Sequence, residues 1–370
     1  MSMSGAMSAA ISGLKTHMQA LNVVGNNIAN VNTYGYKTQR FTFKDSIYST
    51  LSAGSEGTLT TGSTNPRQTG YGCTVGTIDL DMSSGDLVAT GRDLDCTIGG
   101  DGFFLVGPKD IDVNSADAVK KLTLTRVGDF EFRDGYLTDG QGNVVYGFVN
   151  STGTDTPGML DPNNEGKIST DLVPIRLPMR DKGNGLAPDD PGYVAAGGTT
   201  YPGIADTGKN VAPEDADDAN VDGYINYTNM KIDENGKITC TNSDTKEVVV
   251  VGYIALGTVE NPNGVLHTDG PYYSAGDAAG SITVSTPNSA VTGSLRNGNI
   301  FLEDGTTVDP ASQLLGGSTV GIMTSFLEGS STDLATEFTN MILYQRGYQA
   351  NTRIVTVTDT MLEELVNMKR

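Results

Sequence analysis

The amino-acid sequence predicts a mainly β protein whose two ends are α-helices that pair with each other. Three observations support this fold class. Apolar residues recur at helical spacing near the two ends of the 370-residue chain. The stretch between them holds short alternating or apolar runs separated by turn residues. Glycine is frequent, with 47 residues, and tryptophan is absent, which favours a turn-rich β body over a helical one.

Residues 3–28 are predicted to form the first helix. Apolar residues recur there at alternating steps of four and three, which is the spacing of a coiled-coil seam rather than of a wider globular stripe. At heptad spacing this seam contains Met7, Leu14, Leu21 and Ile28. The predicted helix ends at a run of asparagines, whose side chains compete for backbone hydrogen bonds and so favour caps and turns.

Residues 333–369 are predicted to form a second, longer helix. Its seam contains Met341, Tyr344, Tyr348, Asn351, Val355, Thr358, Leu362 and Leu365. Packing of each helix against a domain core is the plain interpretation of such seams. Their position at the two ends of a β-rich chain instead favours pairing with each other, or with copies of themselves. Polar residues at inner positions, His17 and Asn351 among them, weaken an isolated pair but can set its register in a larger assembly.

The middle of the chain is predicted to consist of strands and turns. Strand-length alternating or apolar runs lie within 72–82, 94–106, 122–132, 144–149, 230–241, 247–259, 280–286 and 321–331. Turn signals separate them, and "RDGY" at 133–136 has the Asp-Gly pair of a tight hairpin. The β body is therefore expected to be interrupted and then resumed.

The interruption is residues 151–224, where the composition changes. This segment holds eight of the 14 prolines, and its 13 acidic and 5 basic residues give a net charge of 5 − 13 = −8. We interpret it as a small inserted domain with short strands and long loops, or as partly mobile. The predicted division is an inner helical domain (1–31 and 333–370), an extended connector (32–70), a β domain (71–150 and 225–332) and the insert (151–224). Such nesting places both termini at the same end.

The net charge excludes two classes of partner. Lys and Arg number 24 and Asp and Glu number 44, so the formal net charge is 24 − 44 = −20. Nucleic acid and anionic membrane surfaces bind through clustered Lys and Arg, so we expect no nucleic-acid partner and no membrane partner. No apolar run approaches the roughly 20 residues of a spanning helix. The first 30 residues also lack the pattern of a cleaved secretory signal.

The sequence predicts no catalytic residues, no cofactor and no metal centre. Three cysteines and two histidines do not provide zinc-ligand spacing. A disulfide between Cys73 and Cys96 is an open alternative, but buried free thiols are favoured, Cys240 included. Close carboxylates such as Asp79 and Asp81 have no partner set that suits acid–base chemistry and are interpreted as surface acids.

One alternative of a different class rests on the segment "DANVDG" at 218–223. It matches the first half of a calcium-binding loop, but the twelfth position, where a bidentate Glu is needed, is Asn229. An acidic turn is therefore the favoured interpretation. If the segment did bind calcium, the chain would be an extracellular adhesin-like β protein.

The chain resembles a known family at both ends. The segment "ANVNTYGYK" at 29–37 is similar to the N-terminal signature of bacterial flagellar axial proteins, and the final 40 residues are similar to their C-terminal signature. Two internal segments, 93–106 and 125–148, resemble β-domain strands of hook and rod proteins. The matching positions of the two signatures are Ala29, Asn30, Thr33, Gly35, Tyr36, Lys37, Gln345, Arg346, Tyr348, Ala350, Asn351, Met361 and Leu362.

The resemblance implies a structural axial protein that is not an enzyme. Such proteins polymerise helically, with paired terminal helices lining a central channel and β domains facing outward. They are exported unfolded by the flagellar type III apparatus without a cleaved signal, which places them in the extracellular hook or the basal body. The insert at 151–224 favours the hook branch, and the distal rod branch is the alternative. The implied partners are further copies, the distal rod protein, the hook cap and the hook–filament junction proteins.

The signature at 29–37 then has an expected role. It is the joint where the chain leaves the inner helix and turns outward. Gly35 is expected to permit the turn, and Tyr34, Tyr36 and Lys37 are expected to be free to contact adjacent subunits.

Overall fold

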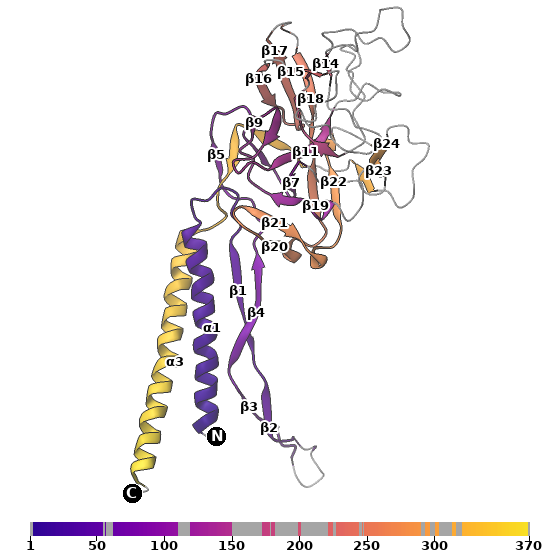
Figure 1. Ribbon diagram of the computed structural model, residues 1–370. Coiled ribbons are helices and arrows are strands. Elements are labelled where there is room, and N and C mark those ends of the chain that lie inside the picture. The colour runs from indigo at the N-terminus through magenta and orange to yellow at the C-terminus, as the bar shows by residue number, and fades with distance from the viewer. Residues whose placement is uncertain are drawn as a thin grey trace, which may run out of the picture. The chain divides into compact units, whose positions relative to one another are not determined.

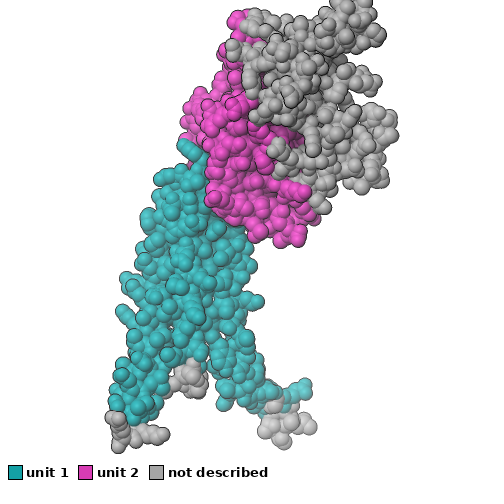
Figure 2. Space-filling view, viewed as in Figure 1, with its two compact units in different colours: residues 1–83, 330–370 teal, residues 84–329 magenta. Residues whose placement is uncertain are grey.

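The structure is a computed structural model of the chain. It describes residues 3–54, 56, 62–109, 119–149, 172–177, 179–181, 199–200, 221–224, 227–243, 246, 248–289, 293–296, 300–302, 313–315 and 320–368. The chain divides into two compact units (Figure 1, Figure 2). Unit 1 is residues 1–83 with 330–370, and unit 2 is residues 84–329.

Unit 1 contains the two helices that the sequence predicts. Helix α1 spans Met3–Ala29 and helix α3 spans Leu334–Met368. They pack against each other and run antiparallel, so that the two chain ends lie at the same end of this unit (Figure 1). The start of α3 is capped by Asp333, whose Oδ1 accepts a hydrogen bond from the backbone N–H of Ala335 at 3.0 Å.

The rest of unit 1 is a pair of antiparallel ribbons. Strand β1 (Gln39–Asp45) pairs with β4 (Cys73–Leu80), and β2 (Tyr48–Ser52) pairs with β3 (Arg67–Gly70). Phe41 of β1 packs on Ala20 and Val23 of α1, so the first ribbon and the helix pair share one small core. The predicted connector therefore holds three strands and clusters with the helices rather than standing apart. The four-part domain division as a whole stays a prediction.

Unit 2 is built on one large antiparallel sheet of thirteen strands. Its main path runs β16-β17-β18-β11-β7-β8-β21-β20, with β9, β10, β12, β19 and β22 branching from it. The bounds are β7 Phe103–Gly107, β8 Thr123–Thr125, β9 Glu131–Arg133, β10 Tyr136–Thr138, β11 Val144–Val149, β12 Val173–Pro174, β16 Tyr227–Ile232, β17 Lys237–Asn242, β18 Val248–Ile254, β19 Leu256–Val259, β20 Val265–His267, β21 Tyr272–Ala275 and β22 Ile282–Ser285.

The described part of unit 2 also contains short strand pairs and three 3₁₀ turns. Strands β5 (Leu87–Ala89) and β6 (Cys96–Ile98), near the start of the unit, pair with β27 (Phe326–Glu328) and β26 (Ile322–Thr324), near its end. The first and last strands of this unit are thus joined by pairing. The turns are η2 Pro262–Gly264, η3 Asp277–Ala279 and η4 Pro287–Ser289.

The core of unit 2 confirms most of the predicted strands. Phe104, Val145, Ile238 and Leu256, from four of these runs, are fully or almost fully buried in one cluster. The predicted hairpin at 133–136 joins β9 to β10, and both turn residues have positive φ, Asp134 at 50° and Gly135 at 78°. These values belong to a type I′ turn, which matches the twist of the flanking strands.

A buried ion pair ties the end of unit 2 to its sheet. The Arg126 Nε lies 3.8 Å from the Glu328 Oε2, and both side chains are 1% exposed. Arg126 also donates to the Gly100 carbonyl at 2.7 Å, and Glu328 accepts from the Gly85 N–H at 3.0 Å. Because each charge has these further partners, the pair is compatible with burial.

Most of the insert at 151–224 lies outside the described residues. The described parts are β12, which joins the large sheet, and three short strands that form a separate sheet in the order β14-β13-β15. Their bounds are β13 Met179–Asp181, β14 Thr199–Thr200 and β15 Val221–Tyr224. A second separate sheet, β24-β23-β25, uses β23 Gly293–Arg296, β24 Ile300–Leu302 and β25 Gln313–Leu315.

Candidate assembly surface

The joint after α1 is an ordered cap rather than a frayed end. The Asn30 side-chain amide donates to the Asn26 carbonyl at 2.9 Å, and its Oδ1 accepts from the Thr33 hydroxyl at 3.2 Å. Gly35 then has a φ of +67°, in the left-handed region that favours glycine, which confirms its predicted role in the turn. Ala29 is exposed at the last helical position. The signature residues thus stop the helix and reverse the chain.

Asn27 is the centre of the joint. It is fully buried and forms three hydrogen bonds with the segment that follows the turn. Its amide donates to the Gln39 carbonyl at 2.8 Å, and its Oδ1 accepts from the Gln39 N–H at 3.0 Å and from the Tyr36 hydroxyl at 3.0 Å. A polar side chain in the core normally costs stability unless its bonds are made, and here they fix the start of β1 against α1. No sequence pattern distinguishes Asn27 from its neighbouring asparagines.

Tyr36 and Lys37 are placed differently from the expectation that they are free to contact adjacent subunits. That expectation is wrong, because Tyr36 is 6% exposed and Lys37 is 1% exposed within unit 1. The Lys37 ammonium donates to the backbone carbonyls of Ser83, at 2.8 Å, and Met82, at 3.4 Å. Burial raises the pKa of Tyr36 to about 12, with a further contribution from the charge of Glu337. Of the three, only Tyr34 is exposed.

The buried face of α1 is a stripe of small and polar side chains. It contains Ala10, Gly13, Thr16, Ala20, Val23, Val24 and Asn27. The predicted seam residues Met7, Leu14, Leu21 and Ile28 are half-buried at its sides. Small residues let the neighbouring backbones come close. The predicted seam included Ala10 and Val24 of this stripe but not Gly13, Thr16 or Ala20.

The two helices interlock at two glycines. A Cβ on Gly13 would lie 2.9 Å from the Asn351 amide nitrogen, and a Cβ on Gly347 would lie 2.5 Å from the His17 ring. His17 also packs beside the rings of Phe43, at 5.1 Å between centroids, and Tyr344, at 6.3 Å. Burial lowers the pKa of His17, so the neutral imidazole is favoured there. Both polar seam residues therefore sit where they can fix the register of the pair.

The seam of α3 divides into two parts. Met341, Tyr344, Tyr348, Asn351 and Val355 are half-buried and Thr358 is buried, in line with their predicted inward face. Met361, Leu362 and Leu365 are exposed, at 51%, 39% and 50%. Because the helices are antiparallel, these last turns of α3 lie beyond the described start of α1.

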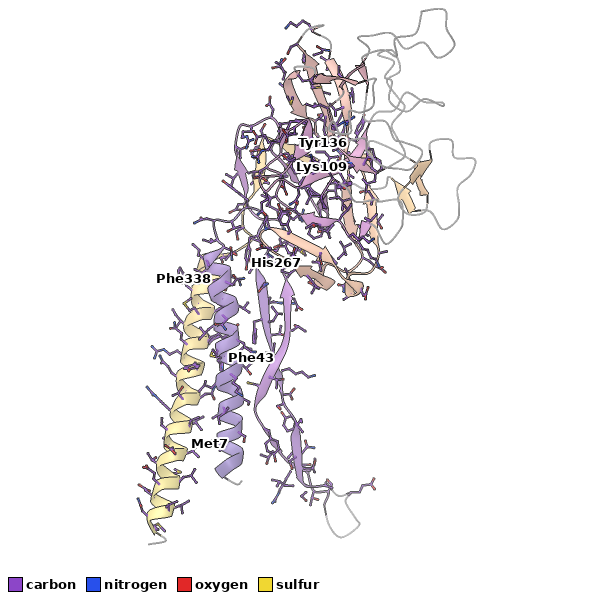
Figure 3. All side chains as sticks on the ribbon, viewed as in Figure 1. Met7, Phe43, Lys109, Tyr136, His267 and Phe338 are labelled. Carbon is purple, nitrogen blue, oxygen red and sulfur yellow. The ribbon has the colours of Figure 1, made fainter. Side chains whose placement is uncertain are left out.

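Large apolar side chains also lie on the side of α3 that faces away from α1. Phe338 is 51% exposed and is labelled there in Figure 3, and Ile342 is 59% exposed. We call the exposed apolar residues of α3 the assembly surface. It comprises Leu334, Phe338, Ile342, Leu343, Ile354, Val357, Met361, Leu362, Leu365, Val366 and Met368. The signature residues Gln345, Arg346 and Ala350 are exposed on the same helix.

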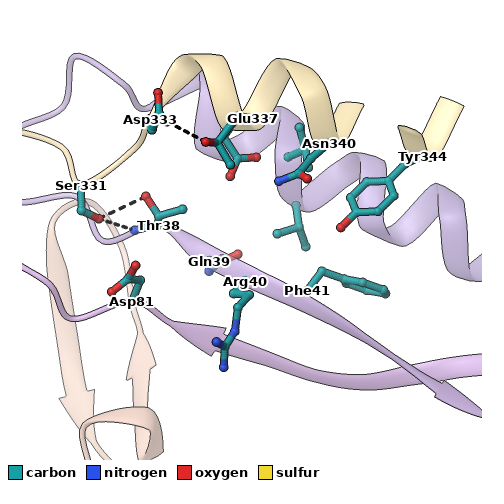
Figure 4. A pocket seen from close by; sticks show the side chains of 13 residues that line it. Thr38, Gln39, Arg40, Phe41, Asp81, Ser331, Asp333, Glu337, Asn340 and Tyr344 are labelled. Atoms are coloured by element: carbon teal, nitrogen blue, oxygen red, sulfur yellow. Dashed lines mark hydrogen bonds between the residues drawn. The ribbon is translucent and has the colours of Figure 1, made fainter. Parts of the chain in front are cut away.

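A pocket of about 270 Å³ lies beside the joint (Figure 4). Val23, Phe41 and Tyr344 provide apolar lining, and the carboxylates of Asp81 and Glu337 provide acidic lining. Glu337 is 6% exposed, and its buried Oε2 has no hydrogen-bond partner within the described part of the chain. Burial raises the pKa of Glu337, an effect that the neighbouring Asn27 amide opposes.

The cysteines, the calcium-like segment and the carboxylate of Asp79 are the other groups that the sequence analysis considered. Cys73 is half-buried, Cys96 and Cys240 are buried, and all three are free thiols, so the open disulfide alternative is excluded. The first three residues of the calcium-like segment at 218–223 lie outside the described residues. Asp79 forms an ion pair with Arg40 at 3.3 Å. Neither described helix is long and apolar enough to cross a membrane.

These features define a class of protein. A helix pair with a fixed register, exposed apolar side chains along α3 and a separate β body are features of a structural subunit that is completed by contacts with other molecules.

The comparisons with known proteins give the family. The model described as Flagella basal body rod protein matches residues 7–37, and the model described as Flagellar basal body rod FlgEFG protein C-terminal matches residues 323–368. The flagellar basal-body rod protein FlgG of Bacillus subtilis is 32% identical over 362 residues, which cover 97% of this chain and 97% of that protein. The flagellar hook protein FlgE of Borreliella burgdorferi is 27% identical, covering 97% and 98%.

A third relative, the flagellar hook protein FlgE of Salmonella typhimurium, is 26% identical, covering 98% of this chain and 99% of that protein. The chain therefore belongs to the flagellar rod and hook protein family, and it is a structural component of the bacterial flagellum. The resemblance found in the two sequence signatures is confirmed.

Proposed function

We propose that the chain polymerises with copies of itself into the tube of the flagellar hook, and that unit 1 forms the inner wall of that tube. The observation that carries this proposal is the assembly surface of α3. Four of its residues, Ile342, Leu343, Val366 and Met368, are 59% exposed or more. Large apolar side chains that are exposed along one helix mark an interaction site. In a helical polymer, neighbouring copies would cover it.

The remaining parts of the proposal follow if unit 1 forms the inner wall of the tube. The acidic unit 2 faces outward, where contacts between copies are weak enough to slide as the tube bends and transmits torque. The distal rod protein, the hook cap and the hook–filament junction proteins contact the ends of the tube. The chain passes through the flagellar type III export apparatus without a cleaved signal and acts outside the cell. Its role is structural, with no catalytic step.

A variant of the assembly surface tests the inner-wall assignment. Leu362 is 39% exposed near the C-terminal end of α3, so Leu362→Asp leaves the fold of the single chain intact. The carboxylate would have to be buried between copies without a partner, which costs several kcal/mol per contact. We expect Leu362→Asp to stay monomeric in sedimentation velocity, with an unchanged β circular-dichroism signal. Lys231→Asp, a charge change at an exposed position of unit 2 outside the assembly surface, is the control. Polymers of normal length from Leu362→Asp would contradict the assignment.

The distal rod is the second candidate function. It is favoured by the 32% identity with the rod protein of Bacillus subtilis over 97% of the chain, which exceeds the 27% and 26% with the hook proteins of Borreliella burgdorferi and Salmonella typhimurium over a similar share. The separate sheet β14-β13-β15, within the insert that the sequence assigns to an additional outer domain, supports the hook. Electron microscopy of self-assembled protein separates the two, since a hook subunit forms a curved tube and a rod subunit a straight one.

A further inference from the structure

The pocket beside the joint has an unbalanced negative charge. Glu337, Asp333 and Asp81 are three carboxylates that line it, and Arg40 is its one basic residue. Arg40 does not neutralise Glu337, since its guanidinium lies on Asp79 and its side chain is 73% exposed. In Figure 4 the Arg40 side chain points away from the Glu337 carboxylate. The pocket therefore suits a positively charged group.

Of the three pocket carboxylates, Glu337 is the one with a buried oxygen that has no hydrogen-bond partner among the described residues. Asp333 bonds to Thr336 and Ala335 at the start of α3, and Asp81 accepts from the Ser83 N–H at 3.0 Å. Glu337 is more deeply buried than a normal surface acid, and its Oε2 is unpartnered within the described residues. A buried carboxylate oxygen without a partner costs free energy that an added donor would remove.

Helix α3 itself offers suitable donors. Arg346 and Arg353 are exposed, and neither forms an ion pair with any described residue. Arg346 follows Phe338 and Ile342 at steps of eight and four, so it lies on the same helical stripe as two residues of the assembly surface. A guanidinium presents a planar set of N–H donors that fits a carboxylate better than an ammonium does.

The charges along α3 are also arranged so that two parallel copies of the helix, shifted along their axis, would place opposite charges side by side. Acids lie at the start of the helix (Asp333, Glu337), bases in the middle and acids again near the end (Asp359, Glu363, Glu364). Glu337 and Arg346 are nine residues apart, which is about 14 Å along a helix. Parallel copies displaced by about this distance place the bases of one helix beside the first acids of the next.

We propose that the pocket is a socket that receives the guanidinium of Arg346 from a second copy of the chain, where it pairs with the Glu337 carboxylate. This inference rests on the proposed self-assembly and adds a specific contact to it. Tyr36 and Tyr344 also face Glu337. In the single chain, burial favours the neutral form of Glu337, and the incoming guanidinium favours the carboxylate.

A double-mutant cycle in full-length protein tests the contact, with the critical concentration for polymerisation as the readout. Glu337→Gln keeps the side-chain shape, and Arg346→Gln is on the surface, so both variants are expected to keep the helical signal of unit 1. Each is expected to raise the critical concentration at least about tenfold, because each leaves a charged partner unpaired at an interface. The double variant is expected to be no worse than the worse single variant.

Two matched variants make the outcome decisive. Glu363→Gln removes an exposed carboxylate from the same helix and is expected to leave assembly unchanged. Arg353→Gln is expected to act additively with Glu337→Gln. Wild-type assembly by Glu337→Gln would overturn the socket, and coupling to Arg353 instead of Arg346 would overturn the assignment of Arg346. If the unmodified chain forms no polymer, the proposed function fails and the socket fails with it. If the unmodified chain polymerises and Glu337→Gln does so equally well, only the socket fails, so the two failures are distinguishable.

Discussion

At the residue scale, the joint after α1 depends on one buried amide. Asn27 supplies two hydrogen bonds to the backbone of Gln39 and one to the Tyr36 hydroxyl. Its side chain therefore joins the end of the helix to the start of the ribbon. Removing it would leave buried donors and acceptors without partners, which costs about 1–3 kcal/mol for each such group.

Asn27→Ala is expected to lower the free energy of unfolding of unit 1 by about 2 kcal/mol. The measurement is urea unfolding followed by the helical circular-dichroism signal. Asn32→Ala is the control, since Asn32 is an exposed asparagine of the same segment and its loss is expected to change stability by less than about 0.5 kcal/mol. Equal effects of the two variants would contradict the central role of Asn27.

The buried Tyr36 hydroxyl is expected to make the stability of unit 1 fall at alkaline pH. Burial raises its pKa from 10.0 to about 12, so the folded state holds the proton more tightly than the unfolded state. The stabilisation from this shift is fully present below pH 10 and is lost as the pH rises through about 12. Unfolding of unit 1 should become easier across this interval, and Tyr36→Phe should remove that part of the dependence. A tyrosine absorbance titration in which every residue ionises near pH 10 would contradict the shift.

At the scale of elements, the close approach of α1 and α3 at glycines determines how the pair fits. Gly347 faces the His17 ring, whereas Gly25 has no atom within 4 Å of where its Cβ would be. Both residues are helical, so alanine at either position raises helix propensity by up to about 1 kcal/mol. Only Gly347→Ala also forces a packed ring to move.

Gly25→Ala is therefore expected to raise the melting temperature of unit 1, and Gly347→Ala to lower it. Strain from added volume in a packed contact costs about 1–3 kcal/mol, which exceeds the gain in helix propensity. Differential scanning calorimetry on the two variants measures the contrast. A similar rise for both would show that the helices do not interlock at Gly347.

The helices and most of the β body could be predicted because local patterns specify them. Both helices and the hairpin at 133–136 follow from spacing and turn residues. Strands β1 to β3 were not predicted, because their burial is weak and their side chains are mostly exposed. The burial of Tyr36 and Lys37 also lay beyond sequence reasoning, since it depends on residues about 45 and 300 positions further along.

At the scale of the whole molecule, the chain combines two compact units with different surfaces. Unit 1 contributes an apolar assembly surface and an acidic pocket, and unit 2 has a sheet of thirteen strands with its own core. Because each unit has its own core, the contacts of one with other copies can change without unfolding the other. This separation is what a tube with a firm inner wall and an adaptable outer surface requires.

Electron cryo-microscopy of the self-assembled protein would show whether unit 1 forms the inner wall of the tube. We expect a tube in which α1 and α3 line the channel, with Ile354, Val357 and Met361 of α3 buried against neighbouring copies. A tube held together by unit 2, with these three side chains still exposed to solvent, would contradict it.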